Sequence, residues 1–307
     1  MNNLSSSSLV TSEEVATALS ENRAVVALET TIIVQGLPAP VNLEVARACE
    51  TAVRSSGATP ATIGLFNGCV VVGLTIDELE QLADPQRRSA KLSARDLGVA
   101  LATGADGATT VAGTIAVAHR AGISVMATGG LGGVHRDASS SFDESADLAT
   151  LARTSVLVVA SGVKSILDIG ATLERLDTLG VPVAGYQTRQ FPGFYLRESG
   201  FALDWALASA NEAAAAFVAH RQFSPSGFLV ANPVPQDHEL DRALHDAALE
   251  NALSVARAKG VTGKDVTPAL LSEFARHTQG VSVQVNRELV VNNARLAGEI
   301  ATSLASL

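Results

Sequence analysis

Short apolar runs alternate with segments of helical periodicity over most of the chain. Continuous runs of Val, Leu, Ile and Ala without polar alternation are typical of strands that are covered on both faces. Such runs occur within residues 24–33, 61–73, 107–111, 123–130, 155–162, 181–188 and 227–234. Between them, apolar residues at helical spacing predict helices near 42–56, 76–83, 113–121, 145–152, 165–179 and 208–222. This alternation predicts an α/β fold with a largely parallel or mixed sheet between helices.

The chain shows no low-complexity linker that would divide it into several domains. After the last strand candidate, helical patterns near 237–259, 267–277 and 286–305 predict a C-terminal helical cover. We therefore predict a single three-layer α/β/α domain over residues 22–307, preceded by an N-terminal tail and a first helix over residues 1–21. Thr11 and Glu14 are spaced as a capping box at the start of that helix.

Composition and charge narrow the class of protein. The 307 residues are 47% hydrophobic and 4% aromatic, which is typical of layered α/β enzymes with Ala, Val, Leu and Ile interiors. A net charge of −9 argues against a nucleic-acid polymer as partner, because affinity for the phosphate backbone depends on clustered Lys and Arg. No apolar run approaches the ~20 residues of a membrane span. With two cysteines, Cys49 and Cys69, we expect a cytoplasmic protein without a disulfide or a membrane partner.

Lys164 stands between the apolar run 156–160 and the predicted helix over 165–179. Burial beside the strand and the positive end of the helix dipole would both favour the neutral amine. A neutral lysine amine is a nucleophile that can form a Schiff base with a carbonyl carbon. The alternative is a lysine whose stem packs at the strand end while its ammonium group reaches solvent.

Glu29 follows five apolar residues at the end of another predicted strand. Burial favours the protonated form of a carboxyl group, which suits a general acid. The alternative is a glutamate that pairs with an arginine at the edge of the sheet.

A stretch of glycine, small and hydroxyl residues over 104–123 leads into a predicted helix near Gly113. Backbone N–H groups at a helix start can bind a phosphate, although such a stretch can equally be a plain turn. Upstream, Lys91 and Arg95 could supply positive charge to an anion, or could be solvated surface residues.

The segment 126–148 combines four closely spaced glycines with a cluster of polar residues. Such a loop can wrap around a ligand, and its carboxylates could hold a hard divalent cation through oxygen and water ligands. The polar residues are His135, Asp137, Asp143, Glu144, Ser145 and Asp147. The structural alternative for the last two is a helix N-cap and an acidic residue in the first helical turn.

Ten ordered blocks of sequence carry a resemblance to a known family. They are "ALETTII.QG.P.P.N", "GATPATIGL", "K.SARDL", "GATTVA.T", "ATGG.GGVHR", "FD.SADL", "VV.SG.KSILD", "GYQT...P.FY.R.SG", "VANPVP" and "NN..LA.EIA". Together they cover about residues 22–305 and resemble the pseudouridine-5′-phosphate glycosidase family, also called the indigoidine synthase A-like family.

The resemblance implies a single α/β/α layered domain that usually forms a homotrimer. It implies reversible cleavage of the C–C glycosidic bond of pseudouridine 5′-phosphate to uracil and ribose 5-phosphate, with Mn²⁺ as the usual metal. A separate pseudouridine kinase would have to supply the phosphate group of the substrate.

The resemblance also assigns roles to residues of this chain. It implies that Lys164 is the nucleophile, that Glu29 is the acid and that Asp143 binds the metal. Implied substrate-binding positions are Lys91, Thr110, Val111, Thr128, His135, Ser145, Ala146, Asp147 and one of Asn292 and Asn293, of which we select Asn292. The chain departs from the family pattern at Asp137 and Glu144, and the added carboxylate beside Asp143 leaves the metal preference open.

Two other functions stay open at this stage. The same fold and imine chemistry could run in synthesis and join ribose 5-phosphate to an aromatic carbon, as a C-glycosynthase. Alternatively, the chain could be a sugar-phosphate sensor that binds without turnover, although binding alone needs no desolvated nucleophile.

Overall fold

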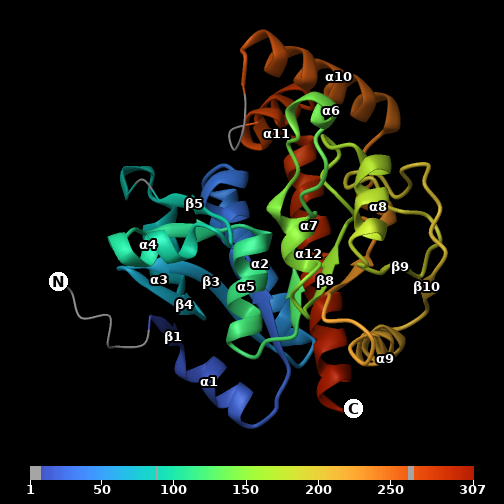
Figure 1. Ribbon diagram of the computed structural model, residues 1–307. Helices are drawn as coiled ribbons and strands as arrows, with labels where there is room; N and C mark the ends of the chain where they lie inside the picture. Colours follow the sequence, from blue (N-terminus) through green and yellow to red (C-terminus); the bar gives the residue numbers. More distant parts are fainter. Residues whose placement is uncertain (1–7, 88, 262–265) are drawn as a thin grey trace.

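The protein, as a computed structural model, is described over residues 8–87, 89–261 and 266–307 (Figure 1). Residues 1–7 of the predicted N-terminal tail lie outside this range. The strands are β1 (Leu9–Thr11), β2 (Val25–Leu28), β3 (Thr59–Phe66), β4 (Cys69–Val72), β5 (Ala90–Leu92), β6 (Gly107–Thr109), β7 (Val125–Ala127), β8 (Leu157–Ala160), β9 (Val183–Tyr186), β10 (Ala206–Leu207) and β11 (Phe228–Ala231).

Within the described residues these strands form one mixed sheet of eleven strands. Its main path runs β1-β4-β3-β2-β7-β8-β11-β9-β10, with β6 added to β3 and β5 added to β6. Pairing is parallel except where β3 meets β4 and β6. The turn between β3 and β4 is Asn67-Gly68, whose positive φ angles of 50° and 75° suit a tight hairpin and explain the local antiparallel pairing. The predicted largely parallel or mixed sheet is thus confirmed.

Helices cover both faces of the sheet (Figure 1). They are α1 (Glu13–Ser20), α2 (Val41–Ser55), α3 (Ile76–Ala83), α4 (Leu97–Thr103), α5 (Val111–Arg120), α6 (Ala138–Ser141), α7 (Ala146–Leu151), α8 (Ile169–Thr178), α9 (Ala210–His220), α10 (Arg242–Ala258), α11 (Val266–His277) and α12 (Val281–Ala305). Short turns of other helix types lie at η1 (Ile32–Gly36), η2 (Pro85–Arg87) and η3 (Gln236–His238).

Alternate residues of each central strand enter two separate cores. In β2, Val25 and Ala27 pack with α1, α5, α7 and α8, whereas Val26 and Leu28 pack with α2, α9 and α12. Because successive strand side chains point to opposite faces, a fully apolar strand such as β2 must be covered on both sides. The predicted three-layer arrangement follows from this pattern.

The C-terminal helices include both core and cover. Helix α12 is buried along much of its length and packs against α2, α9 and the central strands, so it belongs to the core of the domain. Helices α10 and α11 pack against each other at one end of the molecule, near one end of α12 (Figure 1). None of the described helices combines the length and apolar character needed to cross a bilayer.

Several element boundaries differ from the predictions. The first helix is capped by Ser12, which accepts a hydrogen bond from the Val15 N–H, whereas Thr11 belongs to β1; the predicted Thr11 capping box is wrong by one residue. Helix α8 begins at Ile169 with Asp168 as its cap, so the predicted start at Ser165 is also wrong. The short strands β1, β5 and β10 were not predicted, because two or three residues are too few to show a period.

A single buried amide joins α12 to three neighbouring strands. Asn293 is fully buried, and its Nδ2 donates to the Thr128 carbonyl oxygen at 2.8 Å, just beyond β7. Its Oδ1 accepts from Asn232 at 2.9 Å, just beyond β11, and its Nδ2 also reaches the Ser161 hydroxyl beyond β8 at 3.1 Å. The carboxyl ends of β7, β8 and β11 are therefore held in register with α12.

Candidate active site

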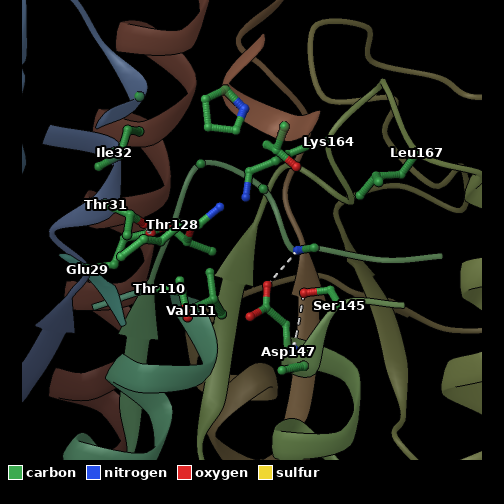
Figure 2. Close-up of a pocket in the computed structure, with 18 of the residues that line it drawn as sticks. Glu29, Thr31, Ile32, Thr110, Val111, Thr128, Ser145, Asp147, Lys164 and Leu167 are labelled. Carbon is green, nitrogen blue, oxygen red and sulfur yellow. Dashed lines mark hydrogen bonds between the residues drawn. The ribbon is translucent and has the colours of Figure 1, made fainter. Parts of the chain in front are cut away.

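A pocket of about 330 Å³ lies beyond the carboxyl ends of β2, β7 and β8. This is where open α/β sheets place their ligands. Figure 2 shows the residues that line it, with Glu29, Thr31 and Thr128 on one side and Lys164 and Leu167 on the other. Eleven predicted site residues line this pocket: Glu29, Lys91, Thr110, Val111, Thr128, His135, Asp143, Ser145, Ala146, Asp147 and Lys164.

The Glu29 carboxyl group is buried at the end of β2, with 7% of the residue exposed. One of its oxygens accepts a hydrogen bond from the Thr31 hydroxyl, and the other accepts from the Thr128 hydroxyl. The described neighbours of this carboxyl are thus hydroxyl groups, in place of the arginine considered as an alternative. A carboxyl held only by hydroxyls, which can donate or accept, can exchange a proton with a ligand without losing an ion pair.

Lys164 lies in an irregular segment between β8 and α8, and it is half-buried. The backbone N–H of Lys164 donates to the Leu131 carbonyl oxygen at 3.1 Å, and the backbone N–H of Leu131 donates to the Gly162 carbonyl oxygen at 2.9 Å. The Lys164 segment therefore continues the β7–β8 pairing into the glycine-rich loop. Because α8 starts only at Ile169, its dipole does not begin beside the amine as predicted.

The glycine-rich loop packs too closely on its neighbours for larger residues. A Cβ atom on Gly132 would lie 2.3 Å from the Ser145 hydroxyl oxygen and 2.6 Å from the nearer Asp147 oxygen. Contacts shorter than 3 Å require the neighbours to move. Glycine at this position thus lets the loop lie against the start of α7.

Asp147 is a buried anion that holds two backbone segments together. One of its carboxylate oxygens accepts from the Ala112 N–H and the other from the Gly132 N–H, both at 2.8 Å. Figure 2 shows the carboxylate at the base of the pocket. The Gly113 N–H donates to the Thr110 hydroxyl at 3.3 Å. Two of the first N–H groups of α5, which we considered as a phosphate site, are therefore already used by side chains.

Positive charge gathers at another part of the pocket. Lys91 lies in β5, Ser93 follows the strand, and Arg95 lies in the turn over residues 94–96; all three line the pocket. Among the described residues, the buried Ser93 hydroxyl has no hydrogen-bond partner. Lys91 and Arg95 thus contribute two cationic side chains to the pocket lining, and the Arg95 guanidinium also lies 3.5 Å from the Asp96 carboxylate.

His135 and Asp143 form a nitrogen and oxygen donor pair on the loop before α7. The His135 Nε2 atom lies 4.0 Å from an Asp143 carboxylate oxygen. Burial lowers the pKa of His135, and the attraction of Asp143 opposes this lowering only in part. A neutral imidazole beside a half-buried carboxylate can bind a divalent cation that keeps several waters. No group of three or more metal-ligating side chains occurs in the part of the chain that the structure describes, so a closed cage is not present there.

The structure does not bring Asn292 to the pocket. Its side-chain oxygen accepts from Arg295 at 2.5 Å on the exposed face of α12. The neighbouring Asn293 is buried beneath the loop, and Asn286, seven residues earlier, lines the pocket. Seven residues are about two helical turns, so Asn286 and Asn293 share a face that Asn292 does not. The assignment to Asn292 is corrected accordingly.

Several pocket residues were missed in the sequence. They are Thr31, Ile32, Gln35, Ser93, Phe194, Thr267, Pro268, Leu271 and Asn286. Most of them come from η1 and from the consecutive helices α11 and α12, which are far from η1 in the chain. For Thr31, the available signal was a polar residue two positions after Glu29.

The fold and pocket together define an α/β enzyme with a lysine amine, a buried carboxyl group and two further cationic side chains in the lining of one cavity. Residues 14–303 match the family described as indigoidine synthase A like protein, and the chain belongs to this family.

Curated relatives and solved structures extend the comparison. A pseudouridine-5′-phosphate glycosidase of Salinispora tropica is 59% identical over 95% of this chain and 91% of the relative, and one of Chloroflexus aurantiacus is 52% identical over 96% and 98%. The prealnumycin C-glycosynthase AlnA in complex with ribulose 5-phosphate is 42% identical, with a TM-score of 0.89 and 97% coverage of both chains. An indigoidine synthase A-like protein of Thermotoga maritima is 33% identical, with a TM-score of 0.87, and the match covers 97% of this chain and 96% of that one.

We predict that Asp147 acts mainly as a structural brace. In Asp147→Asn, an amide nitrogen would face a buried backbone N–H, so one charge-assisted hydrogen bond is lost and a donor is left unpaired. The free energy of unfolding should fall by about 2–3 kcal/mol. Asp143→Asn in the same loop is half-buried and should change it by less than about 0.5 kcal/mol. Urea denaturation measures the free energy of unfolding of both variants, and an equal decrease in the two would contradict a structural role for Asp147.

Proposed function

We propose that this protein is a pseudouridine-5′-phosphate glycosidase. It cleaves the C–C glycosidic bond of pseudouridine 5′-phosphate reversibly, giving uracil and ribose 5-phosphate. The observation that carries the proposal is the meeting of Lys164 and Glu29 in one pocket, on opposite sides of the space that a ligand would fill (Figure 2). Relatives of that name, one 59% identical over nearly the full chain, support the choice of substrate.

The face of the pocket that Lys91, Ser93 and Arg95 line would bind the phosphate group. Lys91 and Arg95 supply positive charge, and the Ser93 hydroxyl supplies a further hydrogen bond. The ribose then extends from this face toward Lys164 and Glu29. Because the Asp147 carboxylate is already engaged by two backbone N–H groups, much of its charge is balanced within the protein.

The first chemical step opens the ribose ring. Glu29 donates its proton to the ring oxygen, the bond from C1′ to that oxygen breaks, and the neutral Lys164 amine forms a bond to C1′. The amine nitrogen then loses a proton, which returns to the Glu29 carboxylate. The product is a secondary amine in which C1′ still carries the base.

The second step releases the base. Glu29, which regained a proton from the amine, delivers it to C5 of the uracil ring, the C1′–C5 bond breaks, and the lone pair of the Lys164 nitrogen forms a C=N bond to C1′. Water then hydrolyses this imine, which releases ribose 5-phosphate and restores the amine. A carbon leaving group cannot be expelled by protonating a glycosidic heteroatom, so the imine route suits this bond better than a carboxylate pair.

Asp143 and the neutral His135 would hold a divalent cation, for which we propose Mn²⁺. When bound, the cation supplies positive charge to the anionic part of the ligand. One carboxylate and one imidazole leave most coordination positions to water or ligand, so binding would be weak and sensitive to chelators.

A second candidate function is C-glycosynthesis on another aromatic acceptor. The 42% identity to the prealnumycin C-glycosynthase supports this second candidate function, since the two chains share a fold over almost their entire lengths. Comparing uracil with other aromatic acceptors in the presence of ribose 5-phosphate separates the two. Coupling of another ring without any use of uracil would select the synthase, and binding without turnover would select a sensor.

The proposal also includes partners outside the chain. A separate pseudouridine kinase would supply the 5′-phosphate. Assembly as a homotrimer is supported by the family resemblance and by large apolar side chains at the surface, including Trp205, which is 70% exposed, and Phe223, which is 88% exposed.

We predict that borohydride added during turnover traps ribose 5-phosphate on Lys164. Reduction of the imine should increase the mass of the peptide that contains this residue. Lys164→Arg should lose the adduct and the activity, because a guanidinium keeps its charge and its geometry. Glu29→Gln should block trapping from the nucleotide, but it should still allow trapping from ribose 5-phosphate, which reaches its open-chain aldehyde unaided. Labelling of a different lysine, or substantial activity in Lys164→Arg, would argue for a solvent-exposed role.

We predict that recognition depends on the phosphate. Lys91→Ala should weaken binding by about 1.5–3 kcal/mol, or roughly 10- to 100-fold in KM, because a hydrogen bond to a charged group is lost. The same substitution should leave the already poor binding of unphosphorylated pseudouridine unchanged. Steady-state kinetics with both substrates measure the effect. Equal turnover of nucleoside and nucleotide by the unmodified enzyme would rule out a phosphate site here.

We predict that activity falls in excess chelator and returns with Mn²⁺. Asp143→Asn should raise the metal concentration that gives half-maximal activity by at least about tenfold, because the charged ligand is lost. Glu144→Gln is the matched control: its carboxylate pairs with Arg175 at 2.8 Å, so its loss should shift the metal requirement less. Undiminished activity in chelator would contradict a metal requirement.

A further inference from the structure

The segment that carries Lys164 has no regular structure of its own. Residues 161–168 connect β8 to α8, and isolated bridges such as that between Val163 and Leu131 join them to their neighbours. For attack, the amine must come within about 3–3.5 Å of the reacting carbon in a suitable direction. The position of the Lys164 backbone, from which the side chain enters the pocket, therefore depends on individual hydrogen bonds from adjacent segments.

The guanidinium group of Arg136 binds the two carbonyl groups that directly follow Lys164. Its Nη2 donates to the Ser165 carbonyl oxygen at 3.3 Å, and its Nε donates to the Ile166 carbonyl oxygen at 3.2 Å. The Nε–H and one N–H of a terminal nitrogen lie along one edge of the planar guanidinium, so a single side chain can meet two neighbouring acceptors. Arg136 thereby ties the turn after the nucleophile to the loop that carries His135.

Backbone hydrogen bonds hold the two ends of the same stretch. The N–H groups of Lys164 and Asp168 donate to carbonyl oxygens of the glycine-rich loop, at 3.1 Å and 2.9 Å. The Arg136 hydrogen bonds fall between these two points. Within the described residues the buried Ser165 hydroxyl has no hydrogen-bond partner, so it adds no polar contact to the stretch. The guanidinium thus ties the middle of the turn to the loop.

We propose that Arg136 is a positioning residue for the nucleophile. It is exposed and lies outside the pocket lining, so it acts on the ligand only through the Lys164 segment. Its two hydrogen bonds hold the turn at Ser165 and Ile166 in the conformation that directs the amine at C1′. The inference rests on the proposed function and adds to it a residue that sets the rate of the chemistry without taking part in binding.

This role requires a guanidinium group and not only a positive charge. A lysine ammonium is a point charge on a flexible stem and cannot present two parallel N–H groups to two carbonyl oxygens. A variant that keeps the charge at position 136 and loses the planar edge therefore separates the two explanations.

The test uses Arg136→Met, which keeps much of the apolar stem and removes the donors. In the full-length protein, kcat for pseudouridine 5′-phosphate should fall about 10- to 100-fold, because a small displacement of a reacting group is enough for such a loss. KM should stay within about threefold of the wild type, since the pocket lining is unchanged. The rate of borohydride trapping on Lys164 at saturating ribose 5-phosphate should fall in the same proportion as kcat. Arg136→Lys should behave as Arg136→Met does.

Chemical rescue tests the hydrogen bonds themselves. Arg136→Ala leaves an exposed space beside the two carbonyl groups. Methylguanidinium, added far below denaturing concentrations, should raise the kcat of this variant at least about fivefold, because it restores the paired donors, whereas methylammonium at the same concentration should not. Arg189→Met is the matched control: Arg189 donates to the Asp204 carbonyl oxygen at 2.8 Å beside the edge strand β10, so its loss should leave kcat unchanged.

Three results would overturn the inference while leaving the proposed function intact. One is a kcat of Arg136→Met within about threefold of the wild type. Another is wild-type activity in Arg136→Lys, which would show that charge alone suffices. The third is a joint loss of binding and turnover in Arg136→Ala without rescue by methylguanidinium, which would indicate a general structural role. Absence of uracil release by the wild type is a different result, which would overturn the proposed function and this inference with it.

Discussion

The buried amide of Asn293 is the contact on which the site depends most. It ties α12 to backbone or side-chain groups just beyond β7, β8 and β11. Thr128, at the first of these points, donates to Glu29, and the loop that follows it pairs with the Lys164 segment. A fully buried amide with several partners has few alternative positions, because shifting it leaves polar groups unpaired. The relative position of acid and nucleophile is therefore set by the core.

The two buried carboxyl groups of the pocket, Asp147 and Glu29, differ in their hydrogen-bond partners and therefore in what they can do. Asp147 is saturated by backbone N–H groups, whereas Glu29 is held by hydroxyls that can reverse their hydrogen bonds. Lys91 and Arg95 line the same cavity as the apolar side chains of Ile32, Phe194 and Leu271. One pocket thus brings together cationic side chains, a buried carboxyl group and apolar side chains.

The sequence predicts the central elements well, and it fails where tertiary contacts override local patterns. Long apolar strands such as β8 show their character directly, because burial on both faces removes polar residues. The residues before Ile169 have helical periodicity, yet the Asp168 N–H bonds to the Val134 carbonyl oxygen and the segment pairs with the loop. Likewise, choosing among Asn286, Asn292 and Asn293 needs the phase of α12 against the sheet. The strand β5 is too short to predict, which hid Ser93.

In the proposed reaction this pocket breaks a C–C bond through Lys164 and protonates the departing carbon. The most direct test of this reaction is turnover of pseudouridine 5′-phosphate in D₂O with Mn²⁺, followed by mass spectrometry and NMR of both products. We predict equal amounts of uracil and ribose 5-phosphate, with one deuterium at C5 of the uracil. Consumption of the nucleotide without uracil, or release of uracil that carries no deuterium at C5, would contradict it.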